Sequence, residues 1–203
     1  PVTITTNAAT ELTCKNIFPV YFANLTVKKV VENSPGNGTN DTAPTDDIFN
    51  FTVTISNYGP NVDLNKGITA VYTYSDNTKE TKVINLTHDK LQFKLKAGDY
   101  VNLNLPACSY TIAETGMEST VHSGDTLADH YTTSYTVNGN VGTDGGTYQL
   151  ASGANHTVIF TNTYKQHMAT LTIRQSGMRT ESGIYQVWNS ANVLIATVMI
   201  VII

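Results

Sequence analysis

The chain has 203 residues, of which 40% are hydrophobic and 14% are charged, and its formal net charge is -4. This length accommodates one good-sized domain or two small ones. The 12 lysines and arginines form no basic stripe, so we expect no nucleic-acid partner. β-branched and aromatic residues recur along the whole chain, which argues against disorder.

Cysteines and histidines give no pattern of a metal or cofactor site. The only two cysteines, Cys14 and Cys108, are too few for a disulfide scaffold or a thiolate metal site. They form at most one disulfide, which would join an N-terminal extension to the loop before a later strand. The histidines lack paired ligand spacing, and we expect them on the surface and predict no cofactor and no metal. They are His88, His122, His130, His156 and His167.

Two-residue alternation of apolar side chains dominates the sequence, and this is typical of β-strands. No window shows a helical stripe with its caps. The alternating segments, in chain order, are Leu25-Val27-Lys29-Val31, Phe49-Phe51-Val53-Ile55, Phe93-Leu95, Val101-Leu103-Leu105, Tyr110-Ile112-Glu114 and Val158-Phe160-Asn162-Tyr164. Turn-forming clusters separate them, so we predict an all-β sandwich of two antiparallel sheets.

The C-terminal part of the chain reads as a separate β-rich segment. Leu171-Thr172-Ile173-Arg174-Gln175 loosely repeats Leu25-Thr26-Val27-Lys28-Lys29. We therefore divide the chain into an extension (1–21), a sandwich (22–166) and a C-terminal segment (167–203) that is too short to bury its own core. The latter is either a strand donated to a neighbouring subunit or part of a further domain.

The apolar run from Val193 to Ile203 is about half the length of a membrane-spanning helix, so we predict no membrane span there. It reads better as a strand. An uncovered apolar strand aggregates, which favours strand addition to another subunit. The candidate assembly residues are Val193, Ile195, Val198 and Ile200.

Three polar residues occupy positions where the alternation requires apolar ones. They are Lys29, Glu114 and Asn162. A buried lone lysine or glutamate is costly, so a chain that places both toward its core either pairs them or uses them. An ordinary ion pair, or polar residues on an edge strand, would also explain the pattern.

Four segments resemble the B-type domain of Gram-positive shaft pilins, which has the collagen-adhesin B-like fold. They are Leu25 to Val31, Phe49 to Val53, Leu105 to Glu114 and Phe160 to Tyr164. The resemblance implies an intramolecular isopeptide bond between Lys29 and Asn162, with Glu114 promoting its formation. Lys28 is the competing nucleophile, but strand alternation turns it to the opposite face.

This resemblance implies an extracellular structural subunit on the cell surface or in a pilus, which polymerises with neighbouring copies. No Leu-Pro-x-Thr-Gly sorting motif occurs in the chain. A host or bacterial surface ligand is a further candidate partner. We expect no enzymatic activity beyond the self-directed formation of the bond.

Two other functions fit the same fold. One is a stalk or spacer domain of a surface adhesin, which would share the crosslinked sandwich without forming a polymer. The other is a carbohydrate- or matrix-binding sandwich, which would need an exposed aromatic patch. Its candidate members are Tyr72, Tyr74, Tyr131 and Tyr135, although alternation favours cross-strand pairs.

Overall fold

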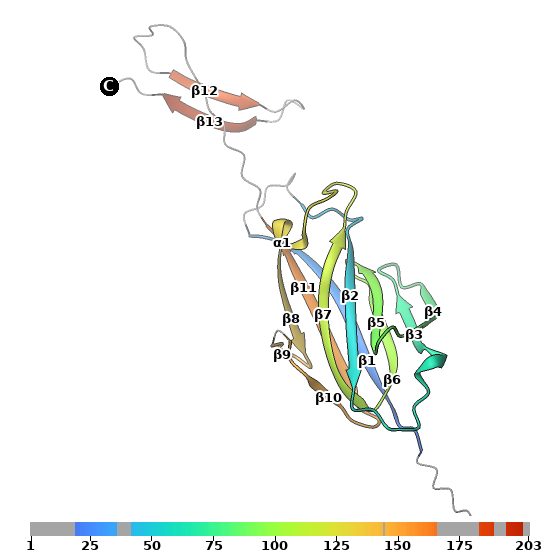
Figure 1. Ribbon diagram of the computed structural model, residues 1–203. Coiled ribbons are helices and arrows are strands. Elements are labelled where there is room, and N and C mark those ends of the chain that lie inside the picture. The colour runs from blue at the N-terminus through green and yellow to red at the C-terminus, as the bar shows by residue number, and fades with distance from the viewer. Residues whose placement is uncertain (1–18, 36–41, 144, 166–182, 189–193, 201–203) are drawn as a thin grey trace, which may run out of the picture. The chain divides into compact units, whose positions relative to one another are not determined.

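The computed structural model describes residues 19–35, 42–143, 145–165, 183–188 and 194–200. The chain divides into two compact units, residues 1–167 and residues 168–203. The first unit contains a two-layer β-sandwich (Figure 1). The candidate site lies in this unit.

The larger sheet of the sandwich has seven strands in the order β4-β3-β6-β1-β11-β8-β9. Their bounds are β1 Phe22–Asn33, β3 Ile68–Thr73, β4 Lys79–Ile84, β6 Tyr100–Pro106, β8 Tyr131–Val137, β9 Asn140–Val141 and β11 Asn155–Tyr164. The smaller sheet has four strands in the order β10-β7-β2-β5. Their bounds are β2 Ile48–Ser56, β5 Lys90–Lys96, β7 Cys108–Glu118 and β10 Tyr148–Leu150.

Alternation in the sequence becomes alternation of burial in the strands. In β2, every second side chain from Phe49 to Ile55 is buried. β5 and β6 show the same period over Leu91–Leu95 and Val101–Leu105. The inward-facing side chains of the two sheets form one hydrophobic core. The predicted all-β sandwich is therefore confirmed.

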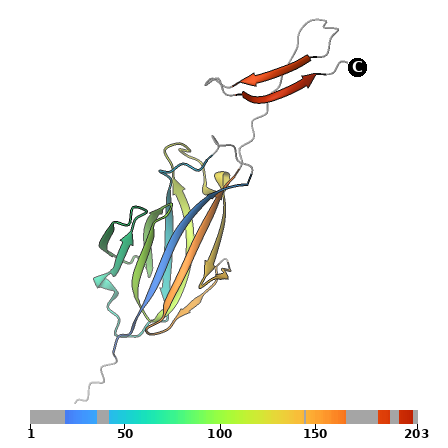
Figure 2. The ribbon, with the colours of Figure 1, turned by 180° about the vertical axis from the view of Figure 1, so that it is seen from behind.

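The central pair of the larger sheet is parallel, although its other neighbours are antiparallel. β1 and β11 run in the same direction, from Asn24 opposite Asn155 to Asn33 opposite Tyr164. Figure 2 shows them side by side, β1 in blue and β11 in orange. Parallel neighbours need a long connection, and here almost the whole sandwich lies between them in sequence. The chain thus enters at one end of this pair and leaves at the other.

Short turns and helices connect the strands. A 3₁₀ turn spans Leu64–Lys66, and α1, the one α-helix among the described residues, spans Leu127–His130. The β8–β9 hairpin turns through Asn138 and Gly139, both with positive φ. Asn-Gly is the preferred pair for such two-residue hairpins, because both positions require a left-handed backbone.

The second unit contains a two-stranded antiparallel sheet of β12 (Gly183–Trp188) and β13 (Leu194–Ile200). The predicted C-terminal strand thus exists, and β12 is its partner, in a register that shifts at Val187/Trp188. Val193 lies outside the described residues. Among the residues described, no helix has the length and apolar character that crossing a membrane requires.

Candidate functional site

The three polar residues singled out in the sequence meet inside the sandwich. Lys29 lies on β1 and Asn162 on the adjacent strand β11, and both are buried. Glu114 lies on β7 in the facing sheet, and its side chain is 1% exposed. The site therefore joins the central strands of one sheet to a strand of the other.

Strand register brings the lysine and the asparagine to one face. In the parallel pair, Lys29 stands opposite Phe160, and Val31 stands opposite Asn162. Residues two apart in a strand share a face, so the Lys29 and Asn162 side chains both enter the core, offset diagonally by one pleat. A long lysine side chain can span such a diagonal.

A β-bulge follows Glu114 in β7. Across β2, Phe51 pairs with Glu114 but Asn50 pairs with Gly116, so Thr115 is the extra residue. Bulges re-aim side chains locally and are frequent beside functional sites. The bulge lets Glu114 continue the inward face of Tyr110 and Ile112 while the chain beyond it leaves that register.

One carboxylate oxygen contacts both of the other residues. Lys29 Nζ lies 2.9 Å from Glu114 Oε1. Asn162 Nδ2 donates a hydrogen bond of 3.0 Å to the same oxygen. Glu114 therefore gathers the amine and the amide around a single point in the core.

Burial controls the protonation of the pair. Desolvation lowers the pKa of Lys29 to about 8, although the nearby Glu114 carboxylate partly opposes the shift. Desolvation also raises the pKa of Glu114, against the opposing effects of Lys29 and Asn162. Both shifts favour the neutral forms, because removal from water penalises charge. The proton of the ion pair thus moves more easily from the amine to the carboxylate than it would in water.

Polar atoms around the site remain unpaired. Among the described residues, Glu114 Oε2 and Asn162 Oδ1 are buried without hydrogen-bond partners. Rotating the Asn162 amide by 180° would turn its carbonyl oxygen toward Glu114. A protonated Glu114 could then donate to that oxygen and polarise the carbonyl carbon. The unpaired atoms are thus those that the reaction would use.

Two further residues belong to the site and were not predicted from the sequence. Thr133 on β8 stands opposite Asn162, and its side chain favours the charged form of Glu114. The ring of Phe49 lies 4.2 Å from Lys29 Nζ and supplies an apolar wall that tolerates a cation. Sequence alternation predicts that Phe49 is a core residue. The contacts that Phe49 and Thr133 make with the site become visible only once the pairing of the strands is known.

This geometry can support amide formation between the two side chains. In such a step, the neutral Lys29 amine would attack the Asn162 carbonyl carbon, while protonated Glu114 would hydrogen-bond the carbonyl oxygen as charge develops there. Loss of the amine proton and its delivery to the departing amide nitrogen would release ammonia. One C–N bond forms and one breaks, so the step needs no oxidant and no external co-reactant.

The competing nucleophile is on the wrong face. Lys28 is exposed, and its Nζ lies over the Tyr100 ring at 5.5 Å from the centroid. It points away from the core that holds Asn162. Strand alternation thus places Lys28 outside and Lys29 inside, as predicted from the sequence.

The candidate disulfide falls partly outside the described residues. Cys14 is not among them. Cys108 is a buried free thiol at the start of β7, within the strand and not in the loop before it. Burial raises the pKa of Cys108 to about 11, so this thiol is unreactive at neutral pH.

The four tyrosines considered as a binding patch do not gather on one surface. Tyr72 on β3 stacks with Tyr74 just beyond the end of that strand, whereas Tyr131 and Tyr135 lie on β8, on the other side of the central pair. Tyr131 is buried and donates a 2.5 Å hydrogen bond to Asp47. Tyr135 stacks on its cross-strand neighbour Phe160 at 4.8 Å between ring centroids. These positions agree with packing roles.

The expectation that the histidines lie on the surface is wrong for His130, which is buried, and His122 is half-buried. His156 is also half-buried, and its Nδ1 lies 3.1 Å from the Tyr110 hydroxyl. His88 is exposed, and His167 lies outside the described residues. The spacing of histidines in the sequence does not show that a loop and the end of a helix bring His122 and His130 together.

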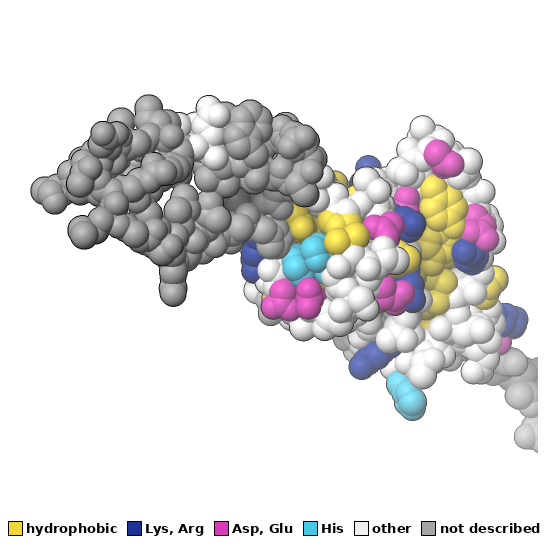
Figure 3. Space-filling view, turned by 90° about the horizontal axis from the view of Figure 1, so that it is seen from above, with side chains coloured by type: hydrophobic (Ala, Val, Ile, Leu, Met, Phe, Trp, Pro, Cys, Tyr) yellow, Lys and Arg dark blue, Asp and Glu magenta, His cyan; other side chains and the backbone are white. Residues whose placement is uncertain are grey.

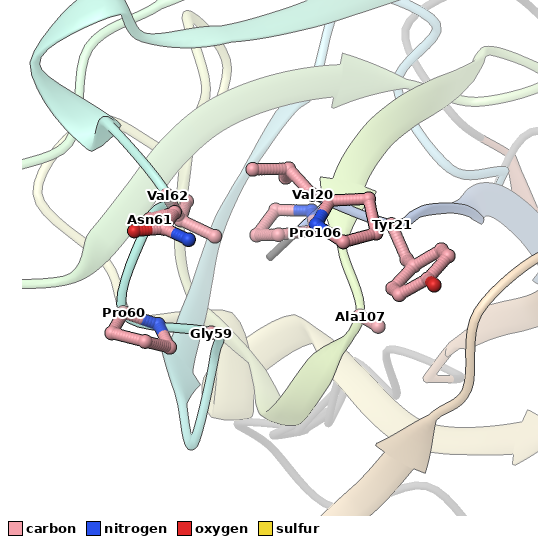
Figure 4. A pocket seen from close by; sticks show the side chains of 9 residues that line it. Val20, Tyr21, Gly59, Pro60, Asn61, Val62, Pro106 and Ala107 are labelled. Atoms are coloured by element: carbon pink, nitrogen blue, oxygen red, sulfur yellow. The ribbon is translucent and has the colours of Figure 1, made fainter. Parts of the chain in front are cut away.

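A small apolar pocket lies where the N-terminal segment meets the loop after β2. Pro19, Val20 and Tyr21 line one side, and Gly59 to Val62 line the other (Figure 4). Pro106 and Ala107 complete it. It offers no titratable pair or nucleophile, so it does not compete with the buried cluster as a site of chemistry.

Comparison with known proteins finds one family and a group of solved structures. The model of a family described as "Domain of unknown function (DUF7601)" matches residues 23–164, which is almost the whole sandwich. None of the curated proteins compared with the chain matches it.

The solved structures are pilus proteins. The major pilin protein T3.2 of Streptococcus pyogenes is 21% identical, with a TM-score of 0.48, over 71% of this chain and 46% of that one. The major pilin from Streptococcus pyogenes in another structure is 20% identical, with a TM-score of 0.42, over 70% and 48% of the two chains. The pilus-presented adhesin Cpa is 22% identical, with a TM-score of 0.40, over 71% and 28%.

The region of similarity is thus about half of each major pilin and less than a third of the adhesin.

Proposed function

The chain belongs to the DUF7601 family, and on that premise we propose that its sandwich is a load-bearing domain of an extracellular pilus-like filament. In this proposal an isopeptide bond between Lys29 and Asn162, promoted by Glu114, closes the domain. The single observation that carries the proposal is the buried cluster of these three residues, joined through Glu114 Oε1.

The position of the cluster on the parallel pair supports a mechanical role. The chain enters the sandwich at Phe22 on β1 and leaves it at Tyr164 on β11. Tension applied at these two points shears β1 against β11, because the strands are parallel neighbours. A covalent bond from Lys29 to Asn162 would carry this tension directly, and residues 30–161 would bear none of it.

The bond would also stabilise the domain against unfolding without load. It closes a loop from Lys29 to Asn162, and by the chain-entropy argument such a loop adds about 5 kcal/mol to the free energy of unfolding. An amide is not reduced by thiols, so the bond would persist in any redox environment. Slow unfolding matters most for a protein outside the cell, where refolding is not assisted.

Surface exposure and polymerisation are the remaining parts of the proposal. The four sequence segments that resemble the pilin B-type domain support a place on the cell surface. The two-stranded sheet of β12 and β13 supplies strand edges through which a neighbouring copy could add a strand. The proposed chemistry acts on the chain itself, and no external substrate is involved.

Single-molecule stretching tests the mechanical role. Unfolding of a domain without the bond should release on the order of 45 nm between residues 29 and 162, at about 3.4 Å per residue. We expect this extension in Lys29→Met and its absence in the parent chain. Lys28→Met is the matched control, because the neighbouring exposed lysine should leave the bond intact. Full extension of the parent chain would contradict a load-bearing crosslink.

Electron microscopy of the purified chain tests assembly separately. Filaments of the parent protein would support the pilus subunit. Isolated monomers at all concentrations would contradict self-assembly and leave a stalk or spacer domain of an adhesin as the function. The stretching result does not depend on this outcome, so the two parts of the proposal can fail independently.

A further inference from the structure

A second cluster of polar side chains lies at the end of the sandwich where β11 finishes. It consists of His122, Asp125 and His130, each of which offers one ligand atom, and these atoms all lie within 4.8 Å of one another. The two imidazole rings stack with their centroids 3.7 Å apart. His130 Nε2 lies 2.8 Å from Asp125 Oδ2. The space-filling view of this end shows histidine side chains beside acidic ones at the surface (Figure 3).

Local hydrogen bonds hold the backbone that carries the cluster. Asp129 accepts from both the backbone N–H and the hydroxyl of Thr126, which fixes the first turn of α1. The N–H of His122 donates to Ser119 Oγ. His130 ends α1 and is buried, whereas Asp125 is exposed. The cluster thus has a rigid base and an open side that solutes can reach.

Tyr164 connects the cluster to the end of β11. Its hydroxyl lies 3.1 Å from His122 Nε2, and its ring stacks with that of His130 at 6.5 Å between centroids. Histidines that bind a metal commonly use one ring nitrogen for the metal and hydrogen-bond a neighbouring group with the other. Tyr164 is placed to serve as that neighbour for His122.

We propose that His122, Asp125 and His130 bind a divalent zinc ion. Two imidazoles and one carboxylate are the ligand types that zinc accepts, with a fourth position left to water. Calcium and magnesium prefer oxygen ligands alone, so this set disfavours them. In the bound form the metal takes the place of the hydrogen between Asp125 and His130.

Binding requires only a local adjustment. Zinc bonds of about 2.0–2.2 Å bring ligand atoms to roughly 3.3 Å from one another in a tetrahedral site. The 2.8 Å contact between His130 Nε2 and Asp125 Oδ2 must therefore lengthen slightly, and any pair of ligand atoms near the 4.8 Å limit must come closer. One of the stacked rings must also turn so that both nitrogens point at the ion. His122 can make this turn, because it is half-buried and lies in the loop between β7 and α1.

The ion would fasten this loop and α1 over the last residues of β11. Asn162 lies on the same strand, two residues before Tyr164. The site would therefore stabilise the end of the sandwich through which the proposed tension passes. It is nevertheless independent of the crosslink, because none of its ligands touches Lys29, Glu114 or Asn162 in the described contacts.

Calorimetric titration of the untagged full chain with zinc, after removal of metals by chelation, tests the proposal. We expect one equivalent to bind, and cobalt in its place to give the visible absorption of a tetrahedral site. His122→Ala and Asp125→Ala should each weaken zinc binding by more than about tenfold. His88→Ala, at an exposed histidine elsewhere in the sandwich, should leave it unchanged.

Both ligand substitutions are at positions that are not fully buried, so the variants should fold, and circular dichroism will verify this. Tyr164→Phe removes only the hydroxyl and should weaken binding less than loss of a ligand does. The proposal is overturned if the folded parent chain binds no zinc. It is equally overturned if His122→Ala and Asp125→Ala bind zinc as the parent does.

Discussion

At the scale of single residues, the central feature is the ion pair between Lys29 and Glu114, which is buried in the core. Burying two charges costs several kcal/mol per ion before their attraction compensates. Two hydrophobic side chains in place of Lys29 and Glu114 would stabilise the fold as well or better. Stability alone therefore does not explain why the core contains this ion pair. Conversion to an uncharged amide would remove the charge of Lys29 from the core for good.

Substitutions of Glu114 separate chemistry from packing. Glu114→Ala should abolish crosslinking, because no group would remain to polarise Asn162 and move the proton. Glu114→Gln keeps the shape and can still donate a hydrogen bond, but it cannot exchange a proton, so crosslinking should be slowed by at least about 100-fold. Intact mass measured over time after refolding reports both rates. Full crosslinking of Glu114→Ala would show that the carboxylate has no such role.

The same burial predicts how pH affects a chain that cannot form the bond. Burial lowers the pKa of folded Lys29 to about 8 from 10.5, and we expect the same burial in Asn162→Ala, so the unfolded state should bind more protons between these values. The free energy of unfolding should therefore rise with pH in that window, by about 3 kcal/mol. The pKa of Glu114 is raised above 4.5, so its contribution is present below pH 4.5 and is lost as pH rises through the folded value.

Stability of Asn162→Ala should thus be lowest between these two windows, near neutral pH. Urea unfolding at a series of pH values measures the profile. The control is the same variant with Lys29→Met and Glu114→Leu added, in which the profile should flatten. Equal profiles for the two proteins would mean that the pair does not carry these shifts.

At the scale of elements, alternation in the sequence predicts most of the strands that have a buried apolar face. β2 and β11 are examples, since every second residue enters the core. β3 is an exception, since Ile68, Ala70 and Tyr72 are buried but the strand was not predicted. β4 was not predicted, because its residues are exposed apart from Ile84 and no alternation marks them. β8 was missed because its centre is polar, from Thr132 to Ser134.

Contacts between residues far apart in the sequence were harder to predict than the positions of the strands. Lys29, Glu114 and Asn162 were found because each interrupts an apolar stripe. Thr133 was not, because a polar residue in a polar strand gives no such signal, and only its register with Asn162 reveals it. The histidine cluster was also missed, because its members come together only through the way in which a loop packs against α1.

The hairpin of the second unit gives an element-scale prediction. Deleting residues 190–203 removes β13 and leaves β12 without its partner. The sandwich should keep its crosslink and its unfolding temperature, because its core lies within the first unit. Assembly by strand addition should be lost, so the truncated chain should remain monomeric by light scattering and electron microscopy. Filaments that form normally from it would contradict donation of this strand.

At the scale of the whole molecule, the strand topology determines what a bond within the cluster of Lys29, Glu114 and Asn162 would do. A bond between β1 and β11 joins the strands at which the chain enters and leaves the sandwich. The same bond between two neighbouring strands of a hairpin would close a short loop and would leave most of the domain under tension. The load-bearing role of the sandwich therefore depends on whether this one covalent bond forms.

The mass of the intact protein tests that link most directly. Formation of the amide releases one ammonia, so the reduced parent chain should be about 17 Da lighter than its sequence requires. Lys28→Met should show the same deficit, whereas Lys29→Met and Asn162→Ala should have their full sequence masses. A parent chain at full sequence mass would contradict the account.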